Sequence, residues 1–298
     1  MKRPSHFLMS PPDYLGMPEA GDEPANDFSR RNHESYTRDP AAFIVTAQDQ
    51  WTALRDTLLQ TGALISYLPP LPGAIDGAFT ADASVTLWRD GHPHVILSQF
   101  ANVPRQVETT HRRAGLTALW GDKMRVANAA FACEGSGDIL YDPHRGCLWA
   151  GYTVDPSRAG GRTDHRAHAE LATFFDMPVT SLAVKRPFFH LDTCFSPLPN
   201  GHVMVWPEGL QPQSWDVVKT MIPPAQMIVV DKEDAYALAC NIIAATPDTL
   251  VTSLISDTLR QALEKCGYTV LPVDVGQFIQ CGGGVHCLTN PLHLGDNA

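Results

Sequence analysis

The chain has 298 residues, of which 44% are hydrophobic and 18% are charged, a composition typical of a globular protein. Its formal net charge of -10 argues against nucleic acid as the main partner, because phosphate binding needs a basic surface. No apolar run is long enough to span a membrane, and the first residues do not fit a signal peptide. These properties predict a cytoplasmic protein with no membrane partner.

The first 40 residues are rich in Pro, Asp, Arg and Asn and predict an irregular segment that covers another part of the protein. A helix is then predicted from Thr46, whose side chain can cap it and which Asp49 follows three residues later. Gly62 can end this helix, and the apolar residues 63–68 after it predict a strand.

The same order of helix, stop and strand recurs four more times at irregular spacings. The helices are predicted over 105–114, 165–175, 214–221 and 256–266, and the strands that follow them over 116–120, 179–184, 226–230 and 268–273. Further short strands are predicted over 85–88, 94–98, 147–152 and 202–205. Five such units favour a five-fold repeat, although a generic α/β sandwich also alternates helices and strands. No clear linker divides the chain, so we expect one domain over 1–298.

Four clusters of polar residues stand at the ends of apolar stretches. Their sequences are Phe-Thr-Ala-Asp at 79–82, Glu-Gly-Ser-Gly-Asp at 134–138, His-Leu-Asp-Thr at 190–193 and Gly-Gly-Gly-Val-His-Cys at 282–287. Taken singly, each has an ordinary structural explanation. His190 and Asp192 could be a paired core histidine, and Glu134 and Asp82 could flank tight turns.

Cys287 is the candidate nucleophile. The glycines before it allow close backbone approach to a ligand and positive φ angles, and His286 beside it could help to hold a thiolate. A cysteine attacks only when its surroundings favour the thiolate. The alternative is a buried structural cysteine in a glycine-rich turn.

The seven cysteines form no CxxC pair. This pattern argues against both a disulfide framework and a zinc-finger array. The twelve histidines and the acids of the clusters could bind a metal, but no HExxH or similar spacing occurs. A metal-dependent hydrolase is therefore the weaker alternative, and we expect neither a metal nor a cofactor.

The clusters are more informative together. A guanidinium is a planar cation that carboxylates bind through paired hydrogen bonds. Asp82, Glu134 and Asp192 would hold such a group, Cys287 could attack its central carbon, and His190 could act as acid and base.

In this order the four clusters resemble the guanidine-modifying enzymes, which are the arginine deiminases, dimethylargininases and amidinotransferases. The resemblance covers most of the chain from about residue 62 onward. It implies the pentein fold, a five-bladed pseudo-symmetric α/β propeller built from ββαβ-type repeats.

The resemblance also implies roles for single residues. Cys287 matches the nucleophile, His190 the general acid and base, and Glu134 the carboxylate that orients the guanidinium. Asp82 and Asp192 match the remaining guanidinium clamps. Phe79 belongs to the same substrate-binding set, and Arg105 and Arg162 resemble arginines that bind a substrate α-carboxylate.

The implied function is hydrolysis of arginine or an arginine derivative through a covalent amidino-thioether, giving a ureido product such as citrulline plus ammonia or an alkylamine. The alternatives are an amidinotransferase, which passes the amidino group to an amine, and a non-enzymatic pentein binding protein. Asp192 resembles the deiminases and amidinotransferases more than the mammalian dimethylargininases, which carry Lys there. Arginine dihydrolases of this fold favour Asn at the position of Asp82. The partner expected is a small guanidino compound, and a homo-oligomer is left open.

Overall fold

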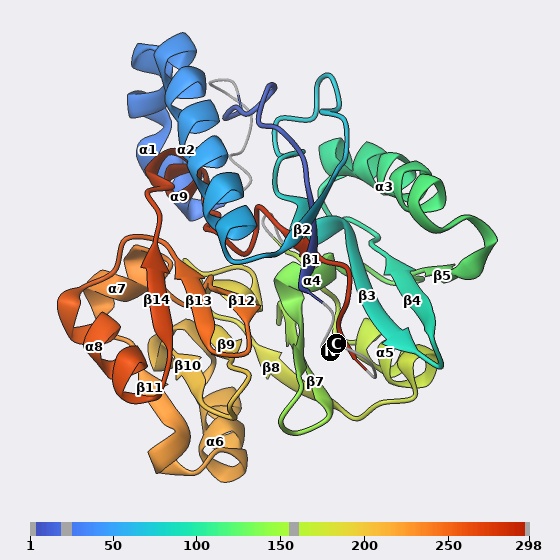
Figure 1. Cartoon of the computed structure of the whole chain (residues 1–298), viewed down its shortest axis with the longest axis vertical. Coiled ribbons are helices and arrows are strands. Elements are labelled where there is room, and N and C mark those ends of the chain that lie inside the picture. The colour runs from blue at the N-terminus through green and yellow to red at the C-terminus, as the bar shows by residue number, and fades with distance from the viewer. Residues whose placement is uncertain (1–3, 19–25, 155–160, 296–298) are drawn as a thin grey trace.

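The computed structural model describes residues 4–18, 26–154 and 161–295. Within them lie five sheets of three strands each (Figure 1). In every sheet the middle strand pairs antiparallel with one neighbour and parallel with the other. Because the parallel neighbour is reached through a helical crossover, each sheet with its helix is one ββαβ unit. The five-bladed pentein propeller predicted from the sequence is confirmed.

The strands of the five blades follow the chain in order, except that the last strand closes the first blade. The first blade contains β1 (His6–Met9), β2 (Leu64–Tyr67) and β15 (Asn290–Pro291). The others contain β3 (Ser84–Arg89), β4 (His92–Leu97) and β5 (Arg125–Asn128); β6 (Ile139–Asp142), β7 (Cys147–Tyr152) and β8 (Val179–Ala183); β9 (Phe195–Pro197), β10 (Val203–Val205) and β11 (Met227–Val229); and β12 (Ile243–Thr246), β13 (Thr249–Thr252) and β14 (Thr269–Pro272).

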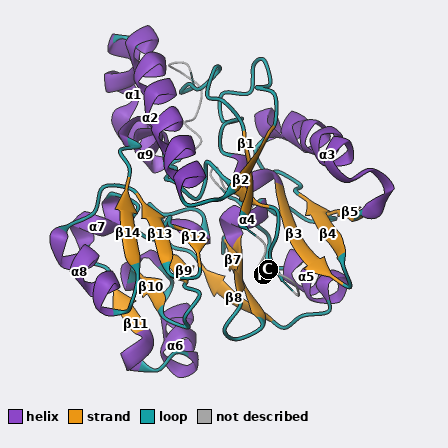
Figure 2. Ribbon diagram, in the orientation of Figure 1, coloured by secondary structure: helices purple, strands orange, loops and turns teal. Residues whose placement is uncertain are grey.

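Figure 2 shows the strands gathered toward the middle, with the crossover helices α3, α6 and α8 at the periphery. The crossover helices are α1 (Asp27–Arg38) and α2 (Pro40–Gln60) in the first blade, then α3 (Gln106–Trp120), α5 (Ala167–Phe175), α6 (Pro212–Met221) and α8 (Asp257–Lys265). Shorter helices are α4 (Gly135–Asp138), α7 (Lys232–Tyr236) and α9 (Gly276–Cys281). None of the helices in the described ranges is long and apolar enough to cross a membrane.

Local chemistry explains where the helices begin. The Ser256 side chain accepts a hydrogen bond from Leu259 N and caps α8, as predicted. The first long helix starts earlier than its predicted start at Thr46. Asp39 caps it by accepting from Ala42 N, and Pro40 occupies its first position.

Two other predictions about elements were wrong. Residues 116–120 form the end of α3 rather than a strand, because Gly115 does not stop this helix. Gly115 instead allows a close approach, since a Cβ there would lie 2.4 Å from Leu68 Cδ1. The first 40 residues are not irregular throughout, because they contain β1 and α1. In Figure 1, α1 lies beside α2 and α9, near the glycine-rich turn before Cys287.

Candidate active site

The predicted site residues come from equivalent places in the fold. In each blade, a short segment just before the antiparallel outer strand supplies a polar side chain to the middle of the propeller. The residues are Asp82 before β3, Glu134 before β6, His190 and Asp192 before β9, Asn241 before β12, and Cys287 before β15. All are at most 3% exposed. The pseudo-symmetry therefore brings together residues that lie far apart in the chain.

His190 lies at the centre of a buried ion-pair network. Its Nε2 is 2.8 Å from Glu134 Oε2, and its Nδ1 is 3.6 Å from Asp82 Oδ1. Burial alone would lower the pKa of His190, but the carboxylates of Asp82, Asp138 and Glu134 raise it to about 9. The imidazole is therefore protonated at neutral pH and ready to act as an acid.

Glu134 is held ionised by two cations. Arg162 Nη1 lies 2.9 Å from the same Oε2 that meets His190, and Ala101 N donates to Oε1. Although burial would raise the pKa of Glu134, Arg162 and then His190 hold it far below its usual range. Burial raises the pKa of the neighbouring Asp138 to about 6, and this carboxyl accepts from Thr163 Oγ1 and Leu191 N.

Cys287 has one donor and one acceptor at its sulfur. Asn241 Nδ2 donates to Sγ over 3.0 Å, and the thiol donates to Asp192 Oδ2 over 3.2 Å. Burial, followed by the charges of Asp192 and Asp82, raises the pKa of this thiol well above its ordinary value. Before a cation binds, the sulfur is therefore a thiol. A guanidinium beside it would favour the thiolate.

Asn241 was not identified from the sequence. Its Oδ1 also accepts from Cys287 N at 3.0 Å, so one amide binds both the backbone and the sulfur of Cys287. The repeat offered a signal, since the other four units each place a polar residue before the antiparallel outer strand. Asn241 is the only polar side chain in the apolar run from Ala237 to Ile243.

The two arginines predicted to bind a substrate carboxylate, Arg105 and Arg162, both lie in the site, but each is paired with acidic side chains of the protein. Arg105 makes a bidentate pair with Glu108, with contacts of 2.8 and 2.9 Å, and Nη1 donates to Asp82 Oδ2 over 2.6 Å. Arg162 pairs with Glu134. Protein guanidiniums thus occupy one side of Asp82 and Glu134, two of the carboxylates that were predicted to hold a guanidinium.

Buried polar atoms of this site that have no hydrogen-bond partner include Asp82 Oδ1, Asp192 Oδ1 and His190 Nδ1, although Asp82 Oδ1 and His190 Nδ1 form an ion pair at 3.6 Å. Unsatisfied buried polar atoms are rare because each costs free energy, on the order of 1–3 kcal/mol. The two carboxylate oxygens are therefore available to the N–H donors of a bound group, whereas the protonated ring nitrogen can itself donate.

Asp82 and His190 line a cavity of about 20 Å³, which is room for about one water molecule. Phe79 lines it and is fixed by contact with Gly283, where a Cβ would lie 2.4 Å from the Phe79 ring. Phe189 also lines it, with its ring centre 4.8 Å from that of the tilted His190 ring and 4.8 Å from Arg162 Cζ. The remaining lining residues include Asp82, Arg105, Cys287 and Asn26, the residue that caps α1. In the described part of the chain no group of three His, Cys, Asp or Glu residues is placed to hold a metal ion.

Asn241 gives a direct prediction about the nucleophile. Asn241→Asp keeps the oxygen that accepts from Cys287 N but replaces the donor to Sγ with a negative charge. We expect Cys287 alkylation by iodoacetamide to slow about tenfold or more, with the thiol titrating at higher pH, because a hydrogen bond to a charged group contributes roughly 1.5–3 kcal/mol. Asn241→Ala, which adds no charge, should be affected less. An alanine variant as reactive as the wild type would show that the amide does not stabilise the thiolate.

The propeller and this set of buried acids, histidine and cysteine define a guanidine-modifying pentein. A family model described as N,N-dimethylarginine dimethylhydrolase, eukaryotic, matches residues 12–294. The chain belongs to this family. The resemblance inferred from the four clusters is thereby confirmed.

Individual relatives agree with this assignment. The chain is 31% identical over 284 residues to a bifunctional arginine dihydrolase/ornithine cyclodeaminase, ArgZ, of Synechocystis. The match includes 95% of this chain but only 37% of that relative. It is 28% identical to an N(G),N(G)-dimethylarginine dimethylaminohydrolase of Mycobacterium tuberculosis, over 84% of this chain and 77% of the other. It thus spans little more than a third of the length of the cyanobacterial relative.

Solved structures show the same fold. The N-terminal domain of ArgZ, in a substrate-bound mutant form, superimposes with a TM-score of 0.85 and 29% identity, over 98% of this chain and 99% of that one. A dimethylarginine dimethylaminohydrolase adduct superimposes with a TM-score of 0.70 at 17% identity, a similarity that concerns the fold alone.

Proposed function

We propose that this protein hydrolyses the guanidinium group of arginine or an arginine derivative through a covalent amidino-thioether on Cys287. The products would be a ureido compound, such as citrulline, and ammonia or an alkylamine. The observation that carries the proposal is the pair of buried carboxylate oxygens that lack a hydrogen-bond donor, Asp82 Oδ1 and Asp192 Oδ1, on two carboxylates close to Cys287 and His190. A guanidinium supplies the missing donors and the positive charge that favours the thiolate.

The first half of the reaction forms a carbon–sulfur bond. Cys287 Sγ adds to the guanidinium carbon. His190 then gives its Nδ1 proton to the departing amine. Nδ1 is the ring nitrogen that is not bonded to Glu134. The carbon–nitrogen bond breaks, and an amidino-thioether remains.

The second half restores the enzyme. Water enters where the amine left, gives a proton to His190 and adds to the same carbon. The thiolate then departs, and the remaining hydroxyl proton is lost to solvent, which leaves the neutral ureido product. Glu134 keeps the ring of His190 oriented through both halves because its contact is to Nε2. The buried site favours a small acceptor such as water over an amine.

The relatives suggest substrates with an α-carboxylate. ArgZ is named as an arginine dihydrolase and the mycobacterial relative as a dimethylarginine dimethylaminohydrolase. We assign the α-carboxylate of the substrate to Arg105 and Arg162, the two arginines that line the cavity. Since both are paired with protein carboxylates, substrate binding would exchange these partners.

A mass-spectrometric screen tests the proposal. Purified protein is incubated with arginine, methylated arginines, agmatine and short guanidino acids, with and without glycine as an amine acceptor. We expect a ureido product without added amine, and an adduct on Cys287 after acid quenching. Product only in the presence of glycine would indicate an amidinotransferase, and no adduct with any guanidine would favour a binding protein.

Asp82→Asn separates substrate positioning from chemistry. The amide loses the charge that Asp82 Oδ1 offers to a guanidinium, so we expect KM to rise about tenfold or more with a smaller change in kcat. Because Asp82 also pairs with Arg105, the matched control is Glu108→Gln. This change weakens the other ion pair of Arg105, and Glu108 does not line the cavity. An equal rise in KM in both variants would show that Asp82 acts only through Arg105.

A further inference from the structure

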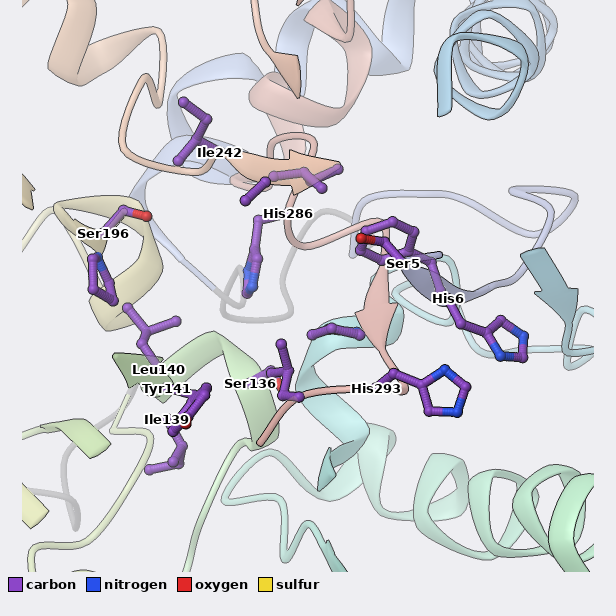
Figure 3. A pocket seen from close by; sticks show the side chains of 16 residues that line it. Ser5, His6, Ser136, Ile139, Leu140, Tyr141, Ser196, Ile242, His286 and His293 are labelled. Atoms are coloured by element: carbon purple, nitrogen blue, oxygen red, sulfur yellow. The ribbon is translucent and has the colours of Figure 1, made fainter. Parts of the chain in front are cut away.

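His286, the residue before the nucleophile, lines a second cavity. This cavity has a volume of about 130 Å³, enough for several water molecules, and we call it the rear cavity. In Figure 3, His286 lies in the middle of it, between Ser196 and Ser136. The described linings of the rear cavity and of the cavity at Cys287 have no residue in common. Two consecutive residues therefore face two different cavities.

The backbone of residue 286 is held from two sides. His286 N donates to Asn241 O over 3.4 Å, and His286 O accepts from Thr289 N over 2.9 Å and from Thr289 Oγ1 over 3.1 Å. The side chain of the same Asn241 binds the backbone and the sulfur of Cys287. Because the two residues share this anchor, the fold sets where the His286 ring lies relative to the sulfur.

The ring of His286 binds the partner of the sulfur. Its Nδ1 lies 2.9 Å from Asp192 Oδ2, and the same oxygen lies 3.2 Å from Cys287 Sγ. A carboxylate only accepts hydrogen bonds, so the thiol and the Nδ1 hydrogen of His286 both donate to Oδ2. Asp192 Oδ1 has no hydrogen-bond partner. The chain therefore supplies two donors to one oxygen of Asp192 and none to the other.

Attack by Cys287 changes this balance, because the thiol must first lose its hydrogen. A thiolate and the Asp192 carboxylate, 3.2 Å apart, repel each other, and the repulsion is strong because the Asp192 side chain is only 3% exposed. The Nδ1 hydrogen of His286 is the donor that Oδ2 keeps when the thiol hydrogen has gone. A donor to a buried carboxylate stabilises its charge, which lowers the cost of a second negative charge on the sulfur.

We propose that His286 is a positioning residue that supports the nucleophile through Asp192. Its Nδ1 hydrogen holds Asp192 Oδ2 beside the sulfur, makes the thiolate of Cys287 easier to form, and leaves Asp192 Oδ1 for the guanidinium. The hydrogen stays on Nδ1 throughout, so His286 transfers no proton. This inference rests on the proposed function, because it concerns the same nucleophile and the same carboxylate. It replaces the direct contact with the thiolate that the sequence suggested for this histidine.

The other titratable residues that line the rear cavity are His6, His293 and Tyr141, and its described lining contains no Asp, Glu, Lys or Arg. His6 Nε2 lies 2.9 Å from Ser66 Oγ, and burial lowers the pKa of His6. Since the ring of His6 bonds to Ser66 and not to Asp192, His6→Asn is the matched control for changing a histidine in this cavity.

Two variants of nearly equal size test the donor. The amide of His286→Asn can place an N–H close to where Nδ1 lies, whereas His286→Leu has no donor. Alkylation of Cys287 by iodoacetamide is followed from pH 7 to 10 by mass spectrometry with peptide mapping. The carbon–sulfur bond forms as iodide leaves, and the thiol proton goes to solvent. We expect His286→Leu to react about tenfold or more slowly at pH 7 and to need higher pH to react, because it loses a hydrogen bond to a charged group. His286→Asn and His6→Asn should react at close to the wild-type rate.

A double-mutant cycle tests whether His286 acts through Asp192. In Asp192→Asn the charge next to the sulfur is gone, so adding His286→Leu should change the alkylation rate little. The same slowing with and without Asp192 would mean that His286 acts elsewhere, and the proposal would be wrong. It would also be wrong if His286→Leu reacts like the wild type, or if a folded His286→Asn is as slow as His286→Leu.

One measurement needs no variant to fold. In wild-type protein with ¹⁵N-labelled histidine, NMR should show a hydrogen on Nδ1 of His286, and a neutral ring with its hydrogen only on Nε2 would overturn the proposal. Iodoacetamide is not a guanidine, so these results do not depend on turnover. A wild-type protein that behaves as expected here but forms no adduct in the guanidine screen would instead overturn the proposed function.

Discussion

Cys287→Ser should lower turnover by about 10⁴-fold or more with the best guanidino substrate, because a hydroxyl in this environment is a far weaker nucleophile than a thiolate. The hydroxyl can still accept from Asn241 and donate to Asp192, which are the two contacts of the sulfur. We therefore expect substrate binding and the melting temperature to stay close to those of the wild type. Turnover and adduct formation are measured by mass spectrometry, and binding by calorimetry.

Cys281→Ser is the matched control, because Cys281 lines the same cavity but the hydrogen bonds of Asn241 and Asp192 to a cysteine sulfur go to Cys287. Burial raises its pKa, so it remains a thiol. This variant should keep most of its activity. Near-full activity in Cys287→Ser would refute the covalent mechanism.

Glu134→Gln should lower the free energy of unfolding by about 3 kcal/mol at pH 7, because it leaves two buried cations, Arg162 and His190, without their shared carboxylate. We also expect kcat to fall about 100-fold, since the imidazole loses the partner that orients and charges it. Urea unfolding and steady-state kinetics across pH 5–10 measure the two effects.

The pH dependence of this stability difference follows from the shifted pKa values. The pKa of His190 is raised to about 9, so its contribution is fully present below its ordinary value of 6.5 and is lost as pH rises through 9. The pKa of Glu134 is lowered, so its contribution is present above its ordinary value of 4.5 and is lost as pH falls below that. The difference in the free energy of unfolding between wild type and Glu134→Gln should therefore be largest between pH 4.5 and pH 6.5.

Activity should also be lost as pH rises through the pKa of His190. The wild type loses the proton of His190 as pH rises through about 9, which removes the acid for the departing amine. In Glu134→Gln the pKa of His190 is lower, so this loss should begin at lower pH. Glu108→Gln is the control, because it removes a buried carboxylate bonded to Arg105 that makes no contact with His190. An unchanged alkaline limit in Glu134→Gln would mean that another group controls it.

Much of the fold could be predicted because its signals are local. All five predicted helices that precede strands overlap observed crossover helices, and Ser256 caps its helix as expected. The failed strand at 116–120 shows the limit of such signals. Gly115 has the composition of a stop, but its missing side chain is used for contact with Leu68 inside a continuing helix. That contact joins residues far apart in the chain, which local propensity does not register.

The candidate site divides in the same way. The sequence by itself determined the residue types: a cysteine after a glycine run, a histidine two residues from an aspartate, and acids that a guanidinium would need. Only the tertiary structure decided their pairing, since a hydrogen bond depends on positions that five separate blades set. It thereby placed Asn241 on the sulfur, paired Arg105 and Arg162 with acids, and joined Asp192 to His286. Protonation followed from burial and neighbouring charge, two properties that exist only once the chain has folded.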